Sequence, residues 1–245
     1  MSAGLLAALI RERQPCVVLT GAGVSTESGI PDFRSPTGIW AEFDPLEYAS
    51  LEAFRADPGK VWSFYAPRFS MLTDAEPNAA HRALAELERR GLVRAVVTQN
   101  IDLLHQRAGS REVIEVHGSI SSSSCLACGA SYPLEAVVDQ LGSRDIPVCV
   151  QCGDVLKPDV VFFGELLPEA SIDQAYALAG DAELLLVVGS ALEVWPVAEL
   201  PLVTQRAGGA VAIVNRGPTA RDRDADLKID GSAGETLESV LVALS

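Results

Sequence analysis

The chain has 245 residues, a net charge of −14 at pH 7, 48% hydrophobic residues and 21% charged residues. This length allows one large domain or a domain with an insertion, and the composition excludes long disordered segments. The negative charge argues against non-specific binding to nucleic acid, and it fits either attraction of a basic partner or simple solubility.

The first sixteen residues, MSAGLLAALIRERQPC, predict a helix that leads into the first strand. Their apolar part is too short, and is followed too soon by charges, for a signal peptide or a membrane span. We therefore expect a cytoplasmic protein that binds no membrane and keeps its thiols reduced.

Apolar runs of strand length recur at residues 16–20, 94–99, 113–116, 160–163, 183–189 and 210–214. Such runs, rich in β-branched residues and without alternation, are typical of strands covered on both faces. Helical patterns lie between several of them, at residues 78–91, 168–180 and 234–244. Strands that alternate with helices predict an α/β fold with a parallel sheet wrapped on both sides.

Residues 18–34, VLTGAGVSTESGIPDFR, begin like a dinucleotide-binding loop. Gly21 permits a tight turn and Gly23 allows close approach to a pyrophosphate, although a lone GxG fits a purely structural turn equally well. Thr26 stands in place of the third glycine of that fingerprint. Residues 32–34, Asp-Phe-Arg, then add a carboxylate, an aromatic ring and a cation. The loop predicts a nucleotide site that does more than hold its ligand, and it disfavours hydride transfer.

Four of the five cysteines, Cys125, Cys128, Cys149 and Cys152, form a C-x2-C-x20-C-x2-C pattern. Four thiolates complete a tetrahedral Zn²⁺ site and leave no open coordination position, which predicts one structural zinc ion. Redox pairs or a disulfide would be compatible with the same pattern, but a reducing cytoplasm disfavours them. Cys16 lies in the first apolar run and is expected to be a core residue.

Several polar residues lie at or just after the end of the strand predicted at residues 94–99. Ligands bind at this carboxyl edge of a parallel sheet. Gln99, Asn100 and Asp102 favour ligand contact there, although an Asn or Asp that caps a helix is an alternative. His117 follows another strand and is the best candidate for a general base. The two other histidines lie in helical patterns and are expected to be packing or surface residues.

In this order the motifs resemble those of the sirtuins of bacterial type, NAD-dependent protein-lysine deacylases, over nearly the full length. The matching segments are 21–34, 98–109, 117–118, the four cysteines, 158–168, 188–201 and 214–219. The resemblance implies one catalytic domain over residues 1–245, in which both ends of the chain build a Rossmann-like, doubly wound large domain. A small zinc module at about 119–157 and a loop-rich, helical insertion at about 31–77 would be inserted in it, with NAD bound in the cleft between.

The resemblance also implies three groups of NAD contacts. The glycine loop would supply Gly21, Ala22, Gly23, Thr26, Asp32, Phe33 and Arg34, of which Phe33 would screen the nicotinamide end. The segment after the second strand, together with the histidine, would supply Gln99, Asn100, Ile101, Asp102 and His117. The phosphate and adenosine side would fall to Gly189, Ser190, Ala191, Asn215, Arg216, Gly217 and Ala233.

In the family, NAD is consumed: the acyl oxygen attacks the ribose carbon as nicotinamide leaves, and the products are lysine and O-acyl-ADP-ribose. The resemblance implies that His117 acts as general base on a ribose hydroxyl, a task that suits an imidazole titrating near neutral pH. Asn100 and Asp102 would complete the catalytic set.

An acyl-lysine protein or peptide would, by the same resemblance, add as a strand between residues 161–165 and 191–194. The substrate contacts would be Val161, Phe163, Gly164, Glu165, Leu192 and Val194. We expect a monomer that binds no nucleic acid. Two departures from the family pattern, Lys157 for a usual Arg and Ala191 for a usual Ser, look tolerable.

Tyr65 and Arg68 resemble the pair with which some sirtuins bind succinyl or malonyl groups, since an Arg fork suits a carboxylate. If Arg68 instead points outward, it is a solvated helix residue beside an apolar pocket. The apolar neighbours favour this second interpretation, and hence deacetylation. The motifs are also compatible with NAD-dependent ADP-ribosyl transfer and with an NAD- or ADP-ribose-binding module without turnover, although the intact His117, Asn100 and Asp102 speak against such a module.

Overall fold

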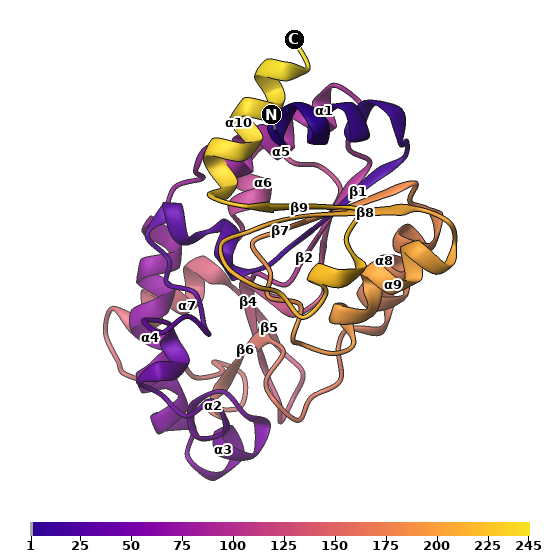
Figure 1. Ribbon diagram of the computed structural model, residues 1–245. Helices are drawn as coiled ribbons and strands as arrows, with labels where there is room; N and C mark the ends of the chain where they lie inside the picture. Colours follow the sequence, from indigo (N-terminus) through magenta and orange to yellow (C-terminus); the bar gives the residue numbers. More distant parts are fainter. Residues whose placement is uncertain (1) are drawn as a thin grey trace.

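Six strands form the central sheet of this structure, a computed structural model that describes residues 2–245 (Figure 1). Their order across the sheet is β3 (Val113–Glu115), β2 (Ala95–Thr98), β1 (Cys16–Thr20), β7 (Leu184–Val188), β8 (Ala210–Asn215) and β9 (Leu227–Asp230). Every neighbouring pair runs parallel. The predicted α/β fold with a doubly wound, Rossmann-like sheet is confirmed.

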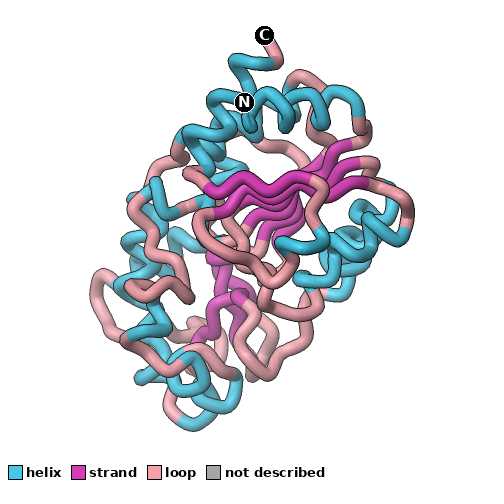
Figure 2. The backbone as a smooth tube through the Cα atoms, in the orientation of Figure 1, coloured by secondary structure: helices cyan, strands magenta, loops and turns pink. Residues whose placement is uncertain are grey.

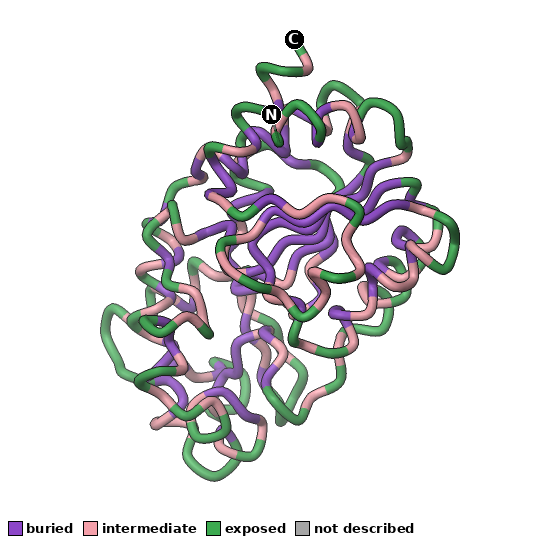
Figure 3. The backbone as a smooth tube through the Cα atoms, viewed as in Figure 1, coloured by how far each residue is buried: buried purple, intermediate pink, exposed green. Residues whose placement is uncertain are grey.

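Helices cover both faces of this sheet. One face carries α1 (Ser2–Glu12), α5 (Ala79–Arg89) and α10 (Ala233–Ala243), which lie together above the sheet in Figure 1. The other face carries α8 (Glu169–Asp181) and α9 (Leu200–Arg206). Strands β1 and β7 are buried at every position (Figure 3), because hydrophobic clusters lie on both sides of them.

All four predicted helices are present, as α1, α5, α8 and α10. Helix α5 begins after Asn78, whose side-chain oxygen accepts hydrogen bonds from the N–H groups of Ala80 and His81. Helix α10 begins after Ser232, whose hydroxyl accepts from the N–H of Glu235. These side chains satisfy N–H groups that the first helical turn leaves without partners, which explains why both helices start where they do.

A smaller antiparallel sheet lies below the first one in Figure 2, in the order β5 (Ser131–Pro133), β4 (Gly118–Cys125) and β6 (Leu156–Val160). Four helices accompany it: α2 (Pro45–Tyr48), α3 (Leu51–Ala56), α4 (Pro58–Asp74) and α7 (Leu134–Leu141). One hydrophobic cluster, with Trp62, Phe69 and Phe162 at its centre, joins these elements. We propose that segments 31–77 and 119–157 form one small lobe around this cluster.

The remaining elements are short. Helix α6 (Leu104–Ala108) follows β2, and five single 3-10 turns span Ala22–Val24, Thr26–Ser28, Ile39–Ala41, Val197–Glu199 and Asp222–Asp224. The first three of these turns lie in the long connection between β1 and α2. Within residues 2–245 there is no helix whose length and hydropathy would let it cross a membrane.

The sequence prediction errs at one expected strand and misses β4, β5, β9 and most of β6. The strand expected at residues 160–163 is wrong, because β6 ends at Val160 and pairs antiparallel with β4 in the small sheet. Beyond it, Phe162 is buried whereas Phe163 is 40% exposed, so the apolar run fills an aromatic cluster instead of a sheet. Strand β9 is missed because its sequence, LKID, mixes apolar and charged residues at the edge of the sheet.

Candidate active site

The loops that follow β1, β7 and β8 pack against one another at the carboxyl edge of the sheet. The N–H of Gly23 donates to the carbonyl of Gly189 at 2.9 Å, and the N–H of Gly189 donates to the carbonyl of Val214 at 2.9 Å. A Cβ atom on Gly23 would lie 2.8 Å from the oxygen of Gly189. Gly23 is therefore required by the packing of one loop on another, in addition to any approach of a pyrophosphate.

A cavity of about 400 Å³ opens beside these loops, a volume within the usual range of ligand sites. Seven residues predicted to bind NAD line it: Gly23, Thr26, Asp32, Gly189, Asn215, Arg216 and Ala233. The cavity also reaches Ser232 at the N-terminus of α10, and helix N-termini favour phosphate groups. Glycine loop, cavity volume and helix terminus together fit a dinucleotide such as NAD.

Glu27 also lines this cavity, although it is not among the site residues predicted from the sequence. Its carboxylate accepts a hydrogen bond from the hydroxyl of Ser232 at 2.6 Å and one from the N–H of Gly234 at 3.3 Å. A Cβ atom on Gly234 would lie 2.3 Å from Oε2 of Glu27. Glu27 thus fastens the glycine loop to the start of α10, and no local sequence signal connects residues so far apart.

A buried hydrogen-bond network joins the glycine loop to the segment after β2. The hydroxyl of Ser25 donates to Oδ2 of Asp102 at 2.7 Å, and Nδ2 of Asn100 donates to the same hydroxyl oxygen at 3.0 Å. All three residues are at least nine-tenths buried. The structure therefore brings together two predicted catalytic residues, Asn100 and Asp102, through a serine that the sequence analysis missed.

Two histidines lie behind this network, and both are buried instead of exposed. Nδ1 of His81 accepts from the N–H of Asn78 at 3.3 Å, so the neutral ring carries its proton on Nε2, which lies 3.4 Å from the hydroxyl oxygen of Ser25. The ring of His105 lies 4.8 Å from that of His81, and its Nε2 is 2.9 Å from Oγ1 of Thr20. Burial lowers the pKa of His81 to about 4 and that of His105 to about 3.

His117 stands between β3 and β4, half-buried. Its Nδ1 lies 3.1 Å from the carbonyl oxygen of Gln99, and a carbonyl can only accept, so Nδ1 carries the proton. Burial lowers the pKa of His117, and the hydrogen bond to Gln99 partly opposes that shift. The ring is therefore neutral near pH 7, with a lone pair on Nε2, as a general base requires.

The side chain of Gln99 connects this group to the loop after β7. Its Nε2 donates to the hydroxyl oxygen of Ser190 at 2.9 Å. Two other residues predicted to bind NAD, Ala191 and Gly217, form backbone hydrogen bonds within the protein. The carbonyl of Ala191 accepts from the N–H of Ala220, and the N–H of Gly217 donates to the carboxylate of Asp230. Neither of these two residues lines the cavity.

The three side chains of residues 32–34 make three different kinds of contact. The carboxylate of Asp32 accepts from the N–H groups of Arg34 and Ser35, at 3.1 and 2.8 Å, and so shapes the loop. The exposed guanidinium of Arg34 lies 3.3 Å from the carboxylate of Glu193. Phe33 stacks on Trp40 with a centroid distance of 5.2 Å.

Two predicted substrate contacts point into the protein. The carboxylate of Glu165 lies 2.9 Å from Nζ of the buried Lys157 and accepts from the N–H of Phe162 at 2.8 Å. Leu192 is only 2% exposed and belongs to a core cluster. Their side chains are therefore not free for a peptide, and these two residues can offer a substrate only their backbones.

Arg68 lies half-buried in α4, which differs from the solvated position that the sequence favours. Its guanidinium stacks over the ring of Phe64 at 3.5 Å and lies 5.0 Å from that of Phe43. It forms no ion pair with any residue in 2–245. Burial lowers the pKa of Arg68. Burial raises the pKa of Tyr65, whose ring stacks on that of Phe162 with centroids 5.2 Å apart.

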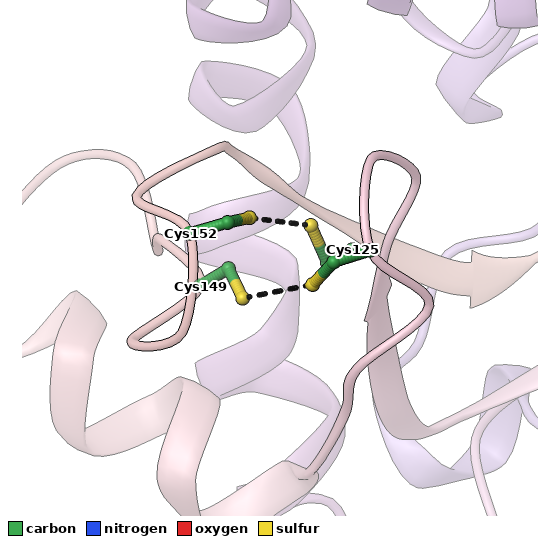
Figure 4. A group of neighbouring side chains, drawn as sticks. Cys125, Cys149 and Cys152 are labelled. Carbon is green, nitrogen blue, oxygen red and sulfur yellow. Dashed lines mark hydrogen bonds between the residues drawn. The ribbon is translucent and has the colours of Figure 1, made fainter.

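The four cysteines of the CxxC pairs come together at one point of the small lobe (Figure 4). All four sulfur atoms lie within 4.8 Å of one another, with 3.4 Å between Cys125 and Cys152 and 3.5 Å between Cys128 and Cys149. These separations exceed a disulfide bond of ~2.05 Å and bracket the ~3.8 Å expected around a tetrahedral Zn²⁺. The four thiols fit one structural zinc ion, and Cys16 is a buried core residue.

A sequence model described as the Sir2 family matches residues 21–196. The chain belongs to the Sir2 family. An Archaeoglobus fulgidus relative named NAD-dependent protein deacylase 2 is 46% identical, over 96% of this chain and 93% of its own. A Thermotoga maritima member named NAD-dependent protein deacetylase is 44% identical, over 95% and 94% of the two chains.

Solved structures of the Sir2 family share the fold over the whole chain. One that contains a deacetylated peptide and 3′-O-acetyl-ADP-ribose matches this structure with a TM-score of 0.95 at 42% identity, and the match covers 100% of both chains. The resemblance inferred from the motifs is therefore confirmed.

Proposed function

We propose that the protein is an NAD-dependent protein-lysine deacylase, which consumes NAD and one water, transfers the acyl group of a lysine side chain to ADP-ribose, and releases nicotinamide and lysine. The observation that carries the proposal is the buried hydrogen-bond network of Ser25, Asn100 and Asp102, with His117 held by the carbonyl of Gln99 next to Asn100, in a structure whose glycine loop also lines a cavity that fits a dinucleotide. Relatives named deacylase and deacetylase support it. So does the similar structure that holds a deacetylated peptide with an acetylated ADP-ribose.

Bound NAD would supply an activated ribose carbon, at which the acyl oxygen displaces nicotinamide, and the ADP-ribose that accepts the acyl group. Asn215, Arg216 and Ala233 would hold its adenosine end in the cavity. Thr26 would face the pyrophosphate, and Phe33 would cover the nicotinamide end.

His117 would take a proton from a ribose hydroxyl through Nε2, because Nδ1 is held by the carbonyl of Gln99. Its lowered pKa keeps this nitrogen free of a proton at neutral pH. Asn100 and Asp102 would orient the ribose, and their own orientation is set by the hydroxyl of Ser25. Pre-organised groups of this kind avoid reorganisation during the reaction.

The test is the release of nicotinamide with a panel of peptides that carry acetyl-, succinyl- or long-acyl-lysine. We expect release that needs both NAD and an acylated peptide, together with stoichiometric free lysine. Release without acyl peptide, or transfer of ADP-ribose onto the protein or peptide, would favour ADP-ribosyl transfer instead. Binding of NAD without turnover on any peptide would favour the non-catalytic module.

His117→Ala is the matched control for the chemistry. A general base contributes about 10²–10⁴-fold, so the variant should lose at least about 100-fold in turnover. Its circular dichroism, zinc content and thermal stability should match those of the wild type. A variant that keeps more than about a tenth of the rate would exclude the base role of His117.

A second candidate function is removal of acyl groups that carry a carboxylate. Arg68 favours it, because an Arg that is partly dehydrated on two rings and has no carboxylate partner is suited to bind one. The comparison is kcat/KM for succinyl- and acetyl-lysine peptides in the wild type, Arg68→Ala and Arg68→Lys. A loss of about 10-fold or more in Arg68→Ala for succinyl alone would establish this function. Equal effects on both peptides would leave deacetylation, as the sequence favours.

Two further expectations remain proposals. We propose a cytoplasmic location, since four thiols able to hold zinc require a reducing compartment. We also propose a monomer that binds peptide but no nucleic acid, on the basis of the net charge of −14. Light scattering checks whether the protein is a monomer. An electrophoretic mobility shift assay checks whether it binds nucleic acid.

A further inference from the structure

Trp40 lies where three segments of the proposed active site meet. Its indole stacks on Phe33 of the glycine loop, with centroids 5.2 Å apart and planes inclined by 30°. On another side it stacks on Phe64 of α4, at 5.9 Å and 12°. Phe163, from the segment proposed to bind the peptide, meets it edge-on at 6.3 Å.

Phe33 and Trp40 are also joined through their backbones. The N–H of Trp40 donates to the carbonyl of Phe33 at 3.0 Å, and the N–H of Ile39 donates to the carbonyl of Asp32 at 2.9 Å. A Cβ atom on Gly38 would lie 2.7 Å from the carbonyl carbon of Phe33. The two aromatic residues are therefore held together as one unit within the loop, and a displacement of Trp40 displaces Phe33.

At its other end this unit contacts α4 through the buried ring of Phe64. Phe64 lies under Trp40 and also under the guanidinium of Arg68, at 3.5 Å. Tyr65, the next residue, meets Phe64 edge-on at 5.1 Å. A chain of contacts thus runs from Arg68 through Phe64 and Trp40 to Phe33.

We propose that Trp40 is a positioning residue that couples an acyl-lysine bound beside Phe163 to the placement of Phe33 over the nicotinamide end of NAD. This inference rests on the proposed function. An acyl-lysine that settles against Phe163, which is 40% exposed and meets Trp40 edge-on, restricts Trp40, and Trp40 in turn holds Phe33. Each aromatic pair is worth about 2- to 10-fold in an equilibrium constant, so a coupling of about 3- to 10-fold is expected.

Trp40 is suited to this task because it is only half-buried and stands outside the set of fully buried side chains, unlike Trp62. Removing it should leave the small lobe folded. Its proposed role differs from that of a catalytic group, since it would act on the two substrates through Phe33 and Phe163. Its effect should therefore appear in how strongly two ligands influence each other.

The test measures the affinity of an unreactive carbocyclic analogue of NAD with and without saturating acetyl-lysine peptide. In the wild type the peptide should tighten the analogue by about 3- to 10-fold, and the peptide affinity must change by the same factor. Trp40→Ala should reduce this factor to near 1, whereas Trp40→Phe should preserve most of it. ADP-ribose, which lacks nicotinamide, should show a factor that does not depend on residue 40.

A folded Trp40→Ala protein with the wild-type coupling factor would overturn the inference. So would an equal loss in Trp40→Phe, or an equal loss with ADP-ribose. If Trp40→Ala does not fold, Trp40→Leu and Trp40→Phe provide the same comparison. Failure of the proposed function is distinct from these outcomes, because it would appear in the wild type as absence of nicotinamide release with every acyl peptide.

Discussion

The hydroxyl of Ser25 donates a 2.7 Å hydrogen bond to the carboxylate of Asp102, and the two residues belong to loops at the ends of different strands. The same hydroxyl oxygen accepts from Nδ2 of Asn100. Ser25 thus fixes the distance and the orientation between two side chains proposed to hold the reacting ribose.

Ser25→Ala should therefore lower kcat for deacylation by about 10- to 100-fold, the range of a hydrogen bond to a buried charged group. The KM for peptide should change less, because Ser25 bonds to the residues proposed to hold the ribose and not to the segment proposed to bind peptide. Steady-state kinetics on acetyl-lysine peptide provide the measurement, with Ser25→Thr as the variant that keeps a hydroxyl. Unchanged kcat in Ser25→Ala would contradict a role in positioning.

Lys157 and Glu165 form a second internal pair, and Nζ of Lys157 also donates to the carbonyls of Pro158 and Val160. Lys157→Met leaves the carboxylate of Glu165 without its cation, which should cost about 3 kcal/mol of unfolding free energy. It should also raise the peptide KM more than the NAD KM, because the pair shapes residues 161–165. Lys157→Arg, which keeps the cation, should restore both quantities. Equal changes in the two KM values would argue against this local effect.

Zinc removal tests the cysteine cluster. Elemental analysis should find one Zn²⁺ per chain, and Cys125→Ser should lose it and lower the melting temperature, because structural zinc contributes folding energy directly. Cys16→Ala is the matched control, since Cys16 lies in β1 away from the cluster and should leave the zinc content unchanged. A chelated protein that stays metal-free, folded and fully active would exclude a structural role.

The buried pair His81 and His105 predicts how stability depends on pH. In the unfolded chain both rings gain a proton near pH 6.5, whereas in the folded chain they do so only near pH 4 and pH 3. The unfolded state therefore binds more protons below pH 6.5, and the unfolding free energy falls by up to about 1.4 kcal/mol per pH unit for each ring. Urea denaturation of the wild type and His105→Asn between pH 7 and 4 measures this pH dependence of the unfolding free energy. The same slope in both proteins would contradict the assignment.

The pH dependence of the reaction should follow His117. Because burial lowers its pKa below the ordinary value of 6.5, the acid limb of kcat/KM should have its midpoint below pH 6.5. The rate falls as pH falls through that midpoint, since the base becomes protonated. A midpoint above pH 7 would assign the limb to another group.

Much of this protein can be predicted from the sequence because its signals are local. The unbroken apolar runs of β1 and β7 predict buried parallel strands, and the two CxxC spacings predict a four-thiolate site. His117 and Asp102 stand out because polar residues directly after such strands must meet at one edge of the sheet. Each of these predictions depends on residues near one another in the chain.

The remaining features depend on contacts between distant segments, which no local pattern encodes. The hydroxyl of Ser25 reaches Asp102 only once β1 and β2 are paired, and the carboxylate of Glu27 reaches α10 only when the two ends of the chain meet. The same holds for Arg68: its sequence context is compatible with either exposure or burial, and the rings of Phe43 and Phe64 decide the outcome. Strand periodicity and metal-ligand spacing are properties of short segments, whereas burial and pairing of a side chain are properties of the packed whole.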